Sequence, residues 1–537
     1  MIYWAIAIAV AAAVVAIYSP SLDFQFILDD HHFVNDPRVQ SSGHLWEYFA
    51  SYVWAQVSGG PPSFYRPIFI LWLRLNAMLS GMSPWGWHLL SIGKHLTVAI
   101  LFGILTWKLL RDRIAALIAA TLFVLHPAHT ESVAWVTVPD PLMSAAVLGG
   151  LLLYFSYVEN VQSKPEKRRS KQSGSRRNSR MWWIASALCC LIALLSKETA
   201  LVLPAIIFAI SMVFGKQDAP NNLRPRFLRA LRESVPFIVV TVIYFLLRFH
   251  ALSGRLGTLT QHLSWRTILL SVPATLWFYV KVLLWPIHSY AFADSIPIDS
   301  WSLAGVLWPA LAACFSVTVL AIGLRWAWNK AGDLAIGERI GIQRTLVLGT
   351  LLLILPLLLT LNLNALDPGD FLHGRYTYLP AAGLMLLLAT AWHLLAKRWR
   401  MAVLIAAGVV AVAFAVLTLK QEDMWKDDLT VYTVAHAIAP NNAPVALNLA
   451  HAHVQMALSL DEQGRCDEAL PIFGEIVKQY PQDWYAWAGQ GDCFLQLKNL
   501  SQAEASFHRA AELSHEPRVT QAWEQIRARL SGTSPAH

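Results

Sequence analysis

The chain has 537 residues, of which 56% are hydrophobic and 14% are charged, and its mean hydropathy is +0.45. This composition is too apolar for an ordinary soluble domain and predicts a polytopic membrane protein, with membrane lipids as its surroundings. The net charge of +8 does not indicate a nucleic-acid partner, because the basic residues cluster in short segments between apolar runs, where membrane orientation requires them.

Apolar runs able to cross the ~30 Å hydrocarbon core recur along the chain. We expect eleven crossings, at 2–18, 86–109, 114–130, 139–158, 181–196, 198–214, 234–250, 301–324, 345–363, 376–396 and 401–419. The first run has no cleavage-site pattern after it, so we interpret it as a retained anchor.

Five segments between these runs are rich in Lys and Arg, and they fix the expected orientation. They are 108–113, 160–180, 216–232, 325–344 and 397–400. Placing all of them in the cytoplasm puts the N-terminus inside, and puts the loop 19–65 and the C-terminal tail outside. Two further apolar segments, 66–80 and 268–286, would break this charge pattern if they crossed. We therefore predict that both lie along the outer leaflet.

Two adjacent carboxylates, Asp29 and Asp30, follow the first apolar run and precede His31 and His32. An acidic pair held this close to the bilayer could act on the head group of a lipid-linked substrate, and the alternative is a solvated acidic start of a loop. These four residues include ligand types that suit a transition metal. Neighbouring residues in an extended segment point in alternate directions, however, so they cannot all bind one ion, and we expect no metal.

Further polar residues are predicted on the outer side, near or within apolar runs, where ionisable groups are costly and indicate function. They are Arg66, His126, His129, Glu131, Asp140, Lys197, Glu198, Arg375 and Tyr376. Lys197 and Glu198 interrupt two apolar runs; the alternative interpretation is a turn whose long side chains extend to water. The two histidines can donate hydrogen bonds to an anion, or can cap the end of the run 114–130.

After residue 420 the composition becomes polar and alanine-rich, and a 34-residue period relates Ala469 to Ala503 and Phe473 to Phe507. Together with Trp487, Gly491, Phe494 and Ala510, these positions have the spacing of tetratricopeptide repeats. An earlier half-repeat, Tyr432, Ala435 and Pro440, lies 41 residues before Phe473, Ile476 and Pro481. We expect the seven extra residues in a turn at 455–465.

Two features of the tail depend on the compartment that it faces. Cys466 and Cys493 could form a disulfide in an oxidising compartment. The one obvious glycosylation sequon in the outside regions, Asn499-Leu500-Ser501, favours a bacterial inner membrane over an endoplasmic reticulum.

The order of motifs resembles a known family. The membrane part contains F-x-x-D-D-H-H-F-V-N-D-P-R-V at 26–39, F-Y-R-P at 64–67, L-H-P-x-H-T-E-S-V-A-W at 125–135, S-K-E at 196–198 and G-R-Y-T-Y-L-P at 374–380, before the repeats. This order resembles the transmembrane and tetratricopeptide-repeat-containing O-mannosyltransferases and their bacterial relatives in the GT-C superfamily. The resemblance covers essentially the whole chain. It implies an all-α fold, with a polytopic catalytic domain at 1–420 and a repeat α-solenoid at 421–537.

The resemblance also implies a polyprenyl-phosphate-linked sugar as donor, mannose foremost, and no resident cofactor. The D-D-H-H-F string is similar to the D-E-x-H-F of the broader protein O-mannosyltransferases, whose first carboxylate is thought to act as base. That position is Asp29 here, and Asp30 takes the second acidic position. Where the animal proteins have G-R-A-D-x-L, this chain has 138–142 with Asp140 but no arginine. A role for that arginine is therefore in doubt.

The expected reaction is inverting transfer to Ser or Thr of a protein, with a carboxylate accepting the proton of the attacking hydroxyl. Charge develops on the departing phosphate, so residues that can stabilise it are assigned to phosphate binding: Arg66, His126, Lys197, Arg375 and Tyr376. We assign a supporting role around these groups to His32, His129, Glu131, Asp140 and Glu198. The repeats would dock an acceptor protein or another partner. Two alternatives remain open: transfer to a lipid or cell-envelope glycan, and a non-enzymatic membrane anchor that displays the repeats.

Overall fold

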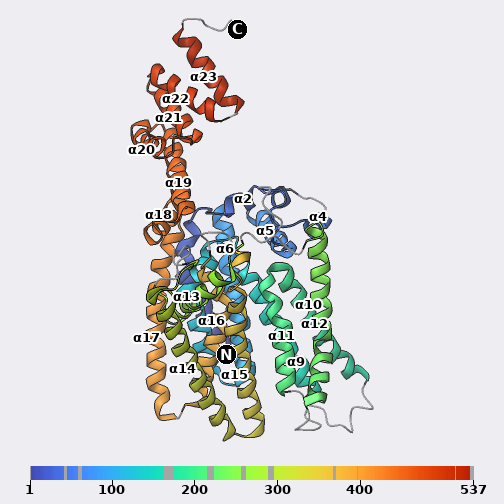
Figure 1. Cartoon of the computed structure of the whole chain (residues 1–537). Coiled ribbons are helices and arrows are strands. Elements are labelled where there is room, and N and C mark those ends of the chain that lie inside the picture. The colour runs from blue at the N-terminus through green and yellow to red at the C-terminus, as the bar shows by residue number, and fades with distance from the viewer. Residues whose placement is uncertain are drawn as a thin grey trace. The chain divides into compact units, whose positions relative to one another are not determined.

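The computed structural model describes residues 2–41, 45–57, 63–162, 173–214, 223–255, 262–287, 296–366, 371–395, 397–514 and 516–531. Every regular element within these ranges is a helix (Figure 1). The chain divides into two compact units, Met1–Asp427 and Asp428–His537. The first unit extends past the predicted boundary at 420, because α17 (Lys397–Glu422) continues into the short η8 (Asp423–Trp425).

The first unit is a bundle of long apolar helices. They are α1 (Ile2–Tyr18), α6 (Pro84–Leu110), α7 (Arg113–Val124), α9 (Asp140–Gln162), α10 (Ser173–Ser196), α11 (Val202–Phe214), α12 (Leu223–Ala251), α13 (Trp265–Leu284), α14 (Trp308–Gly332), α15 (Ile336–Leu359), α16 (Tyr378–Leu394) and α17. In Figure 1, α9 to α12 stand together on the right of this bundle, whereas α14 to α17 stand on the left. Within the described ranges, nine helices are long and apolar enough to cross a membrane. The chain is thus an integral membrane protein.

The prediction of eleven crossings needs correction at three of its runs. At 2–18, the 17-residue α1 is not among these nine helices. The run 114–130 is interrupted: α7 ends at Val124, and the helical residues Pro127–Ala134 follow at a bend of 54°. Proline has no backbone N–H to continue the helix, so the chain turns at this point. Counting the bent pair as one span gives ten candidates in the described part of the chain. The run 198–214 forms only the 13-residue α11 after a short 3-10 turn.

The two segments assigned to the outer leaflet differ from each other. Helix α5 (Pro67–Ser80) has 14 residues. At a rise of ~1.5 Å per residue it reaches ~21 Å, which is too short for a crossing. Helix α13 has 20 residues and is long and apolar enough to span. The prediction that 268–286 does not cross the membrane used only the charges of the neighbouring segments. Those charges do not limit the length of the helix.

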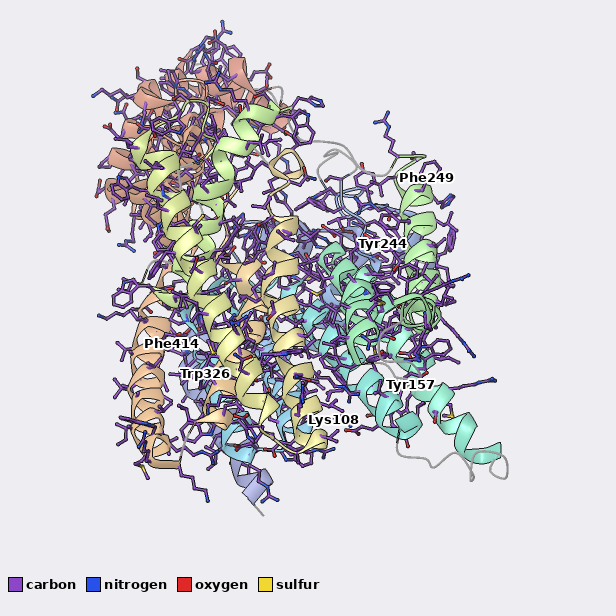
Figure 2. All side chains as sticks on the ribbon, turned by 60° about the horizontal axis from the view of Figure 1, so that its bottom comes forward. Lys108, Tyr157, Tyr244, Phe249, Trp326 and Phe414 are labelled. Atoms are coloured by element: carbon purple, nitrogen blue, oxygen red, sulfur yellow. The ribbon has the colours of Figure 1, made fainter. Side chains whose placement is uncertain are left out.

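The described residues of the basic segments, or residues next to them, contact one another at one end of the bundle. Four ion pairs link these residues: Lys108–Glu159, Arg111–Glu159, His393–Asp112 and His393–Glu338. In addition, Arg400 donates to the His393 carbonyl, and the Arg344 guanidinium lies over the Phe214 ring. Figure 2 shows Lys108 and Tyr157 toward this end, and Tyr244 and Phe249 toward the other. Lys164, Lys167, Arg168, Arg169 and Lys171, part of the second segment, lie outside the described residues.

The loop after α1 folds as a small cap at the opposite end of the bundle. It consists of η1 (Ser19–Asp23), α2 (Asp30–Val34), α3 (Pro37–Gln40) and α4 (Leu45–Ala50), followed by α5. Its own apolar core includes Phe33, Val39, Tyr48, Val53, Phe69, Ile70, Leu73 and Trp87. The buried Arg38 donates to Asp36, to Ser51 Oγ at 2.9 Å and to the Tyr52 carbonyl at 3.0 Å. This packing fixes the position of α2.

The second unit consists of α18 (Asp428–Ile438), α19 (Ala443–Glu462), α20 (Cys466–Gln479), α21 (Trp484–Gln496), α22 (Leu500–Leu513) and α23 (Pro517–Leu530). Phe473 and Phe507 are buried at matching positions of α20 and α22. A Cβ at Gly491 would approach the Phe507 ring to 2.8 Å, so the close packing of α21 on α22 requires glycine. The seven extra residues do not form the expected turn at 455–465, because α19 continues unbroken for 20 residues to Glu462.

Candidate active site

The acidic pair lies at the start of α2, and its two members differ in burial. Asp30 is fully buried. Its carboxylate accepts hydrogen bonds from the Ile27 N–H at 3.2 Å, the Thr137 N–H at 3.1 Å and the Thr137 hydroxyl at 2.7 Å. Burial raises the pKa of Asp30 to about 7, although these hydrogen bonds oppose the shift. Asp30 therefore fastens α2 to the segment that contains Thr137.

Asp29 is half-buried and directly precedes α2, so it is the member of the pair that solvent can reach. The preceding residue, Leu28, has φ +52°, a left-handed conformation that costs energy for a leucine and sets the direction of the turn. His31 and His32 are exposed, and the His32 ring lies 6.2 Å from the Trp54 ring. The metal argument assumed an extended segment, whereas residues 30–34 form a helical turn.

Glu131 and Arg375 form a buried ion pair on two segments that are distant in sequence. The Glu131 carboxylate accepts from the Arg375 backbone N–H at 2.9 Å, from Arg375 Nη1 at 2.9 Å and from His373 Nδ1 at 2.8 Å. The Arg375 guanidinium also lies 4.6 Å from the centre of the Trp135 ring. Trp135 is two residues from Thr137, the partner of Asp30. The segment 131–137 thus places Arg375 at the same end of the bundle as the acidic pair.

Lys197 and Asp140 form a second buried pair, with Nζ to Oδ2 at 2.6 Å. The Lys197 ammonium lies 5.1 Å from the centre of the Tyr376 ring, so this pair adjoins the segment of Arg375. Burial lowers the pKa of Lys197, and the ion pair with Asp140 opposes that shift. Glu198, which follows Lys197, pairs with Arg66, and Tyr376 follows Arg375, so both arginines belong to segments that adjoin Lys197.

Arg66 and Glu198 form a third pair, in which two guanidinium nitrogens contact both carboxylate oxygens, at 3.0 and 2.6 Å. Arg66 directly precedes α5, and its guanidinium covers the Phe64 ring at 4.4 Å. Three cations from distant segments therefore converge, each compensated by one carboxylate. The structure brings Arg66, Lys197, Arg375 and Tyr376 together with Glu131, Asp140 and Glu198.

The two histidines of the bent segment do not face the converging charges. His126 Nδ1 accepts from the Ala128 N–H at 3.2 Å, and its Nε2 contacts the Leu283 carbonyl at 3.0 Å. Both ring nitrogens are thus engaged within the fold, so the geometry does not support phosphate binding by His126. His129 is fully buried among rings, with Phe123 and Tyr378 each 4.5 Å away. Neither of its ring nitrogens has a hydrogen-bond partner among the described residues.

Sequence reasoning missed Lys94, Thr137 and His373. Lys94 is buried in α6, and its ammonium donates to the carbonyls of Val136 at 3.1 Å and Val138 at 3.4 Å. A lysine in the middle of the predicted span 86–109 is itself an indication of function that could have identified it. Thr137 and His373 gave no such indication, because their partners, Asp30 and Glu131, are far away in the sequence.

The fold and the site define a class: an all-α integral membrane protein with an ion-paired polar site at one end of its bundle and a tetratricopeptide-repeat tail. The tetratricopeptide-repeat family matches residues 454–516, in agreement with the predicted repeats.

The chain is similar to protein O-mannosyl-transferases from animals. It is 23% identical to mouse TMTC3 over 94% of this chain and 54% of the mouse protein. With human TMTC4 the identity is 26%, over 83% of this chain and 63% of the human protein. With Drosophila melanogaster Tmtc2 it is 32%, over 39% of this chain and 22% of the fly protein. The chain spans about half the length of the TMTC3 proteins that it matches.

Among solved structures, similar chains include ArnT from Cupriavidus metallidurans bound to undecaprenyl phosphate, with a TM-score of 0.44 and 14% identity over 94% of this chain and 77% of ArnT. Another is the Archaeoglobus fulgidus oligosaccharyltransferase AglB in complex with an inhibitory peptide and a dolichol-phosphate. Its TM-score is 0.42, with 11% identity over 83% of this chain and 59% of AglB.

Proposed function

We propose that the chain is an integral-membrane glycosyltransferase that moves a sugar, mannose foremost, from a polyprenyl phosphate to a Ser or Thr hydroxyl of a protein. The similarity to protein O-mannosyl-transferases supports the sugar and the acceptor. The observation that carries the proposal is the convergence of Arg66, Lys197 and Arg375 at the end of the bundle where Asp29 precedes α2. In this account that end is extracytoplasmic in a bacterial inner membrane, and the basic end is cytoplasmic.

Asp29 acts as general base in this proposal. The acceptor hydroxyl gives its proton to Asp29 as its oxygen bonds to the anomeric carbon, and the bond from that carbon to the phosphate oxygen breaks. Attack from the face opposite the phosphate inverts the anomeric configuration. Asp29 is half-buried, so a hydroxyl can reach its side chain, whereas Asp30 is fully buried and accepts hydrogen bonds from Thr137 and Ile27. Asp30 is thus a positioning residue, in place of the catalytic role that the sequence suggested.

The departing phosphate receives the electron pair of the broken bond, and the cations stabilise the charge that develops there. Groups held in place before the reaction contribute most to such stabilisation. Arg375 and Arg66 are held by carboxylates, and Lys197 is held by Asp140. A guanidinium can bind two phosphate oxygens at once, which favours the arginines as direct contacts. In this proposal the repeats bind the acceptor protein.

A transfer assay with the Asp29→Asn variant tests the proposal. The full chain, purified in detergent, would be incubated with polyprenyl-phosphate mannose and a Ser/Thr-containing peptide, and glycopeptide would be measured by mass spectrometry. We expect at least a ~100-fold loss of rate, since general-base catalysis contributes ~10²–10⁴-fold. Asp23→Asn is the matched control, because Asp23 is exposed in η1 and should leave the rate unchanged. Near-normal transfer by a folded Asp29→Asn variant would exclude Asp29 as base.

A further inference from the structure

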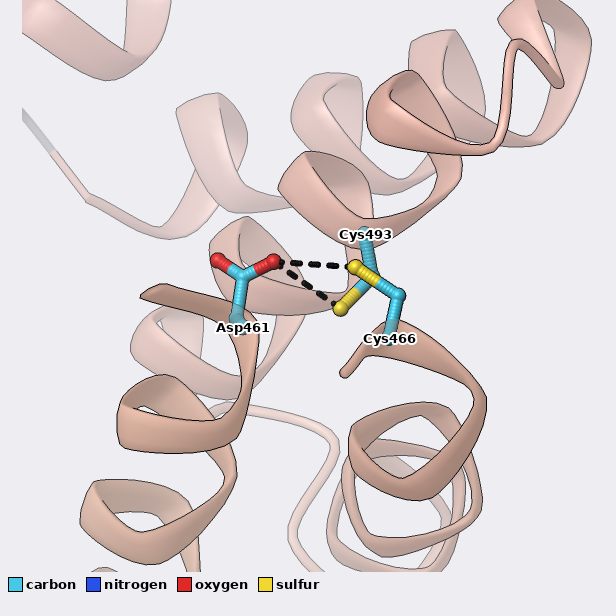
Figure 3. A group of neighbouring side chains, drawn as sticks. All are labelled: Asp461, Cys466 and Cys493. Carbon is cyan, nitrogen blue, oxygen red and sulfur yellow. Dashed lines mark hydrogen bonds between the residues drawn. The ribbon is translucent and has the colours of Figure 1, made fainter. Parts of the chain in front are cut away.

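The tail contains a cluster of two thiols and a carboxylate that the proposed function does not use. Asp461 lies in the last turn of α19, Cys466 is the first residue of α20, and Cys493 lies in α21. All three side chains are buried, and Figure 3 shows the two sulfurs and the carboxylate turned toward one another. Gly464, at φ +74°, makes the sharp turn that returns α20 against α19.

The carboxylate is the centre of this cluster. Asp461 Oδ1 accepts from Cys493 Sγ at 3.0 Å, from Cys466 Sγ at 3.3 Å and from Gln496 Nε2 at 2.8 Å. One ligand atom from each of Asp461, Cys466 and Cys493 lies within 4.8 Å of the other two. Among the described residues, no cation forms an ion pair with Asp461. A buried carboxylate without a cation is an uncommon arrangement, because its charge is desolvated without compensation.

We propose that Asp461, Cys466 and Cys493 bind one borderline-soft divalent metal ion, such as Zn²⁺. A tetrahedral zinc site with Zn–S of ~2.3 Å and Zn–O of ~2.1 Å sets sulfur and oxygen ~3.6 Å apart. The observed separations of 3.0 and 3.3 Å need to open by only a few tenths of an ångström. On binding, both thiols release their protons to water and the sulfurs become thiolate ligands. A water molecule takes the fourth position, and Gln496 orients the carboxylate through its hydrogen bond.

The cluster suits a metal better than a disulfide between the two cysteines. A disulfide has no S–H, so Asp461 Oδ1 would lose two of its three donors while it remained buried. A divalent metal instead replaces both donors with one direct bond to Oδ1, and because two protons leave as it binds, the net charge of the buried site does not change. Such a metal also joins α19, α20 and α21, and therefore links two consecutive repeats. Metal content then controls the packing of the array.

The test measures metal binding by the full chain in detergent under reducing conditions. Zinc content after dialysis would be determined by mass spectrometry, and a Cd²⁺ titration would follow the ultraviolet thiolate-to-metal absorption. We expect one metal per wild-type chain, and affinity at least ~100-fold weaker in Cys466→Ser and in Cys493→Ser. Gln496→Ala should weaken binding ~10-fold. Asp467→Asn and Cys314→Ser, which alter exposed residues, are the matched controls and should bind normally.

Two results would overturn the proposal. One is wild-type protein that, with both thiols reduced, binds no metal above background. The other is stoichiometric metal retained by the Cys466→Ser/Cys493→Ser double variant. Asp461→Asn tests whether metal binding is lost without loss of the fold, because asparagine keeps the shape of the side chain and can still accept the hydrogen bond from Gln496. This variant should melt like wild type without metal, yet gain less thermal stability from Zn²⁺ than wild type does.

Discussion

The two ends of the membrane unit both carry ion pairs, but the most exposed of the pairs described above lies at the basic end and the most buried lie at the other. At the basic end, Arg111 is 62% exposed and its partner Glu159 is 43% exposed. At the opposite end, Glu131 is 1% exposed, and Asp140 and Lys197 are 5% and 6% exposed. Exposed pairs contribute little free energy, so the basic end fits a role in membrane orientation. Buried pairs carry a large desolvation penalty, and their presence at one end calls for a functional reason.

From the contrast between the two ends, we expect substitution of Glu131 to have the largest effect on the free energy of unfolding. Replacing Glu131 with Gln removes the charge that compensates the buried Arg375 guanidinium and leaves that cation desolvated. We expect the free energy of unfolding to fall by ~3–5 kcal/mol, measured by chemical denaturation of the detergent-solubilised chain. Glu159→Gln is the matched control at the basic end. Equal effects of the two substitutions would contradict the contrast between the ends.

The next effect concerns the coupling between Lys197 and Asp140. Lys197→Met leaves Asp140 buried without its cation, whereas Lys197→Met/Asp140→Asn removes both charges. We expect the double variant to recover part of the lost stability, with a coupling free energy of ~1–3 kcal/mol in a double-mutant cycle. Additive effects within experimental error would show that the 2.6 Å contact contributes no coupling.

A third prediction uses the pKa of Asp30, which is about 7 in the folded chain, compared with ~3.9 in an unfolded chain. Below pH ~4 the group is protonated in both states, and between pH ~4 and ~7 the folded state alone holds the proton. The free energy of unfolding should therefore fall as pH rises through this window, by up to ~1.4 kcal/mol per pH unit, and level off above pH ~7. Denaturation midpoints at several pH values would show this slope. Asp30→Asn should make this slope less steep, and an unchanged slope in the variant would assign it to other groups.

The smallest effect is expected for Arg111. Its ion pair with Glu159 is exposed, so Arg111→Ala should change the free energy of unfolding by less than ~1 kcal/mol and leave sugar transfer unchanged. The small difference should also shrink as salt is added, because surface charges are screened. A stability loss as large as that of Glu131→Gln would show that exposure does not govern these pairs.

Much of the fold could be predicted from the sequence, because the length of each apolar run and the positive charge of the segments between the runs are local properties of the chain. The repeat tail followed from Phe473 and Phe507, whose 34-residue spacing repeats one helix pair. The break after Val124 was missed because the long apolar run outweighed Pro127. The extra residues before Cys466 were predicted to form a turn, whereas they lengthen α19. No local sequence pattern distinguishes a longer helix from a longer turn at this point.

The sequence indicated several residues of the candidate site but not their partners. Ionisable residues near apolar runs identified Arg66, Lys197 and Arg375, because burying such charges is costly anywhere. Their partners depend on tertiary contacts, as in the 2.6 Å contact between Arg66 and Glu198, 132 residues apart. The inward position of His126 depends in the same way on the Leu283 carbonyl, 157 residues away.

The most direct test of the account is binding of a polyprenyl phosphate to two charge-balanced double variants. Glu131→Gln/Arg375→Gln removes a buried pair from the proposed site, and Glu159→Gln/Arg111→Gln removes an exposed pair from the basic end. Equilibrium binding of a fluorescent polyprenyl phosphate to the full chain in lipid nanodiscs would give both dissociation constants. We expect binding to weaken ~10-fold or more in the first variant, since a charged hydrogen bond contributes ~1.5–3 kcal/mol, and to be unchanged in the second. Unchanged binding in the first variant, or an equal loss in both, would contradict the account.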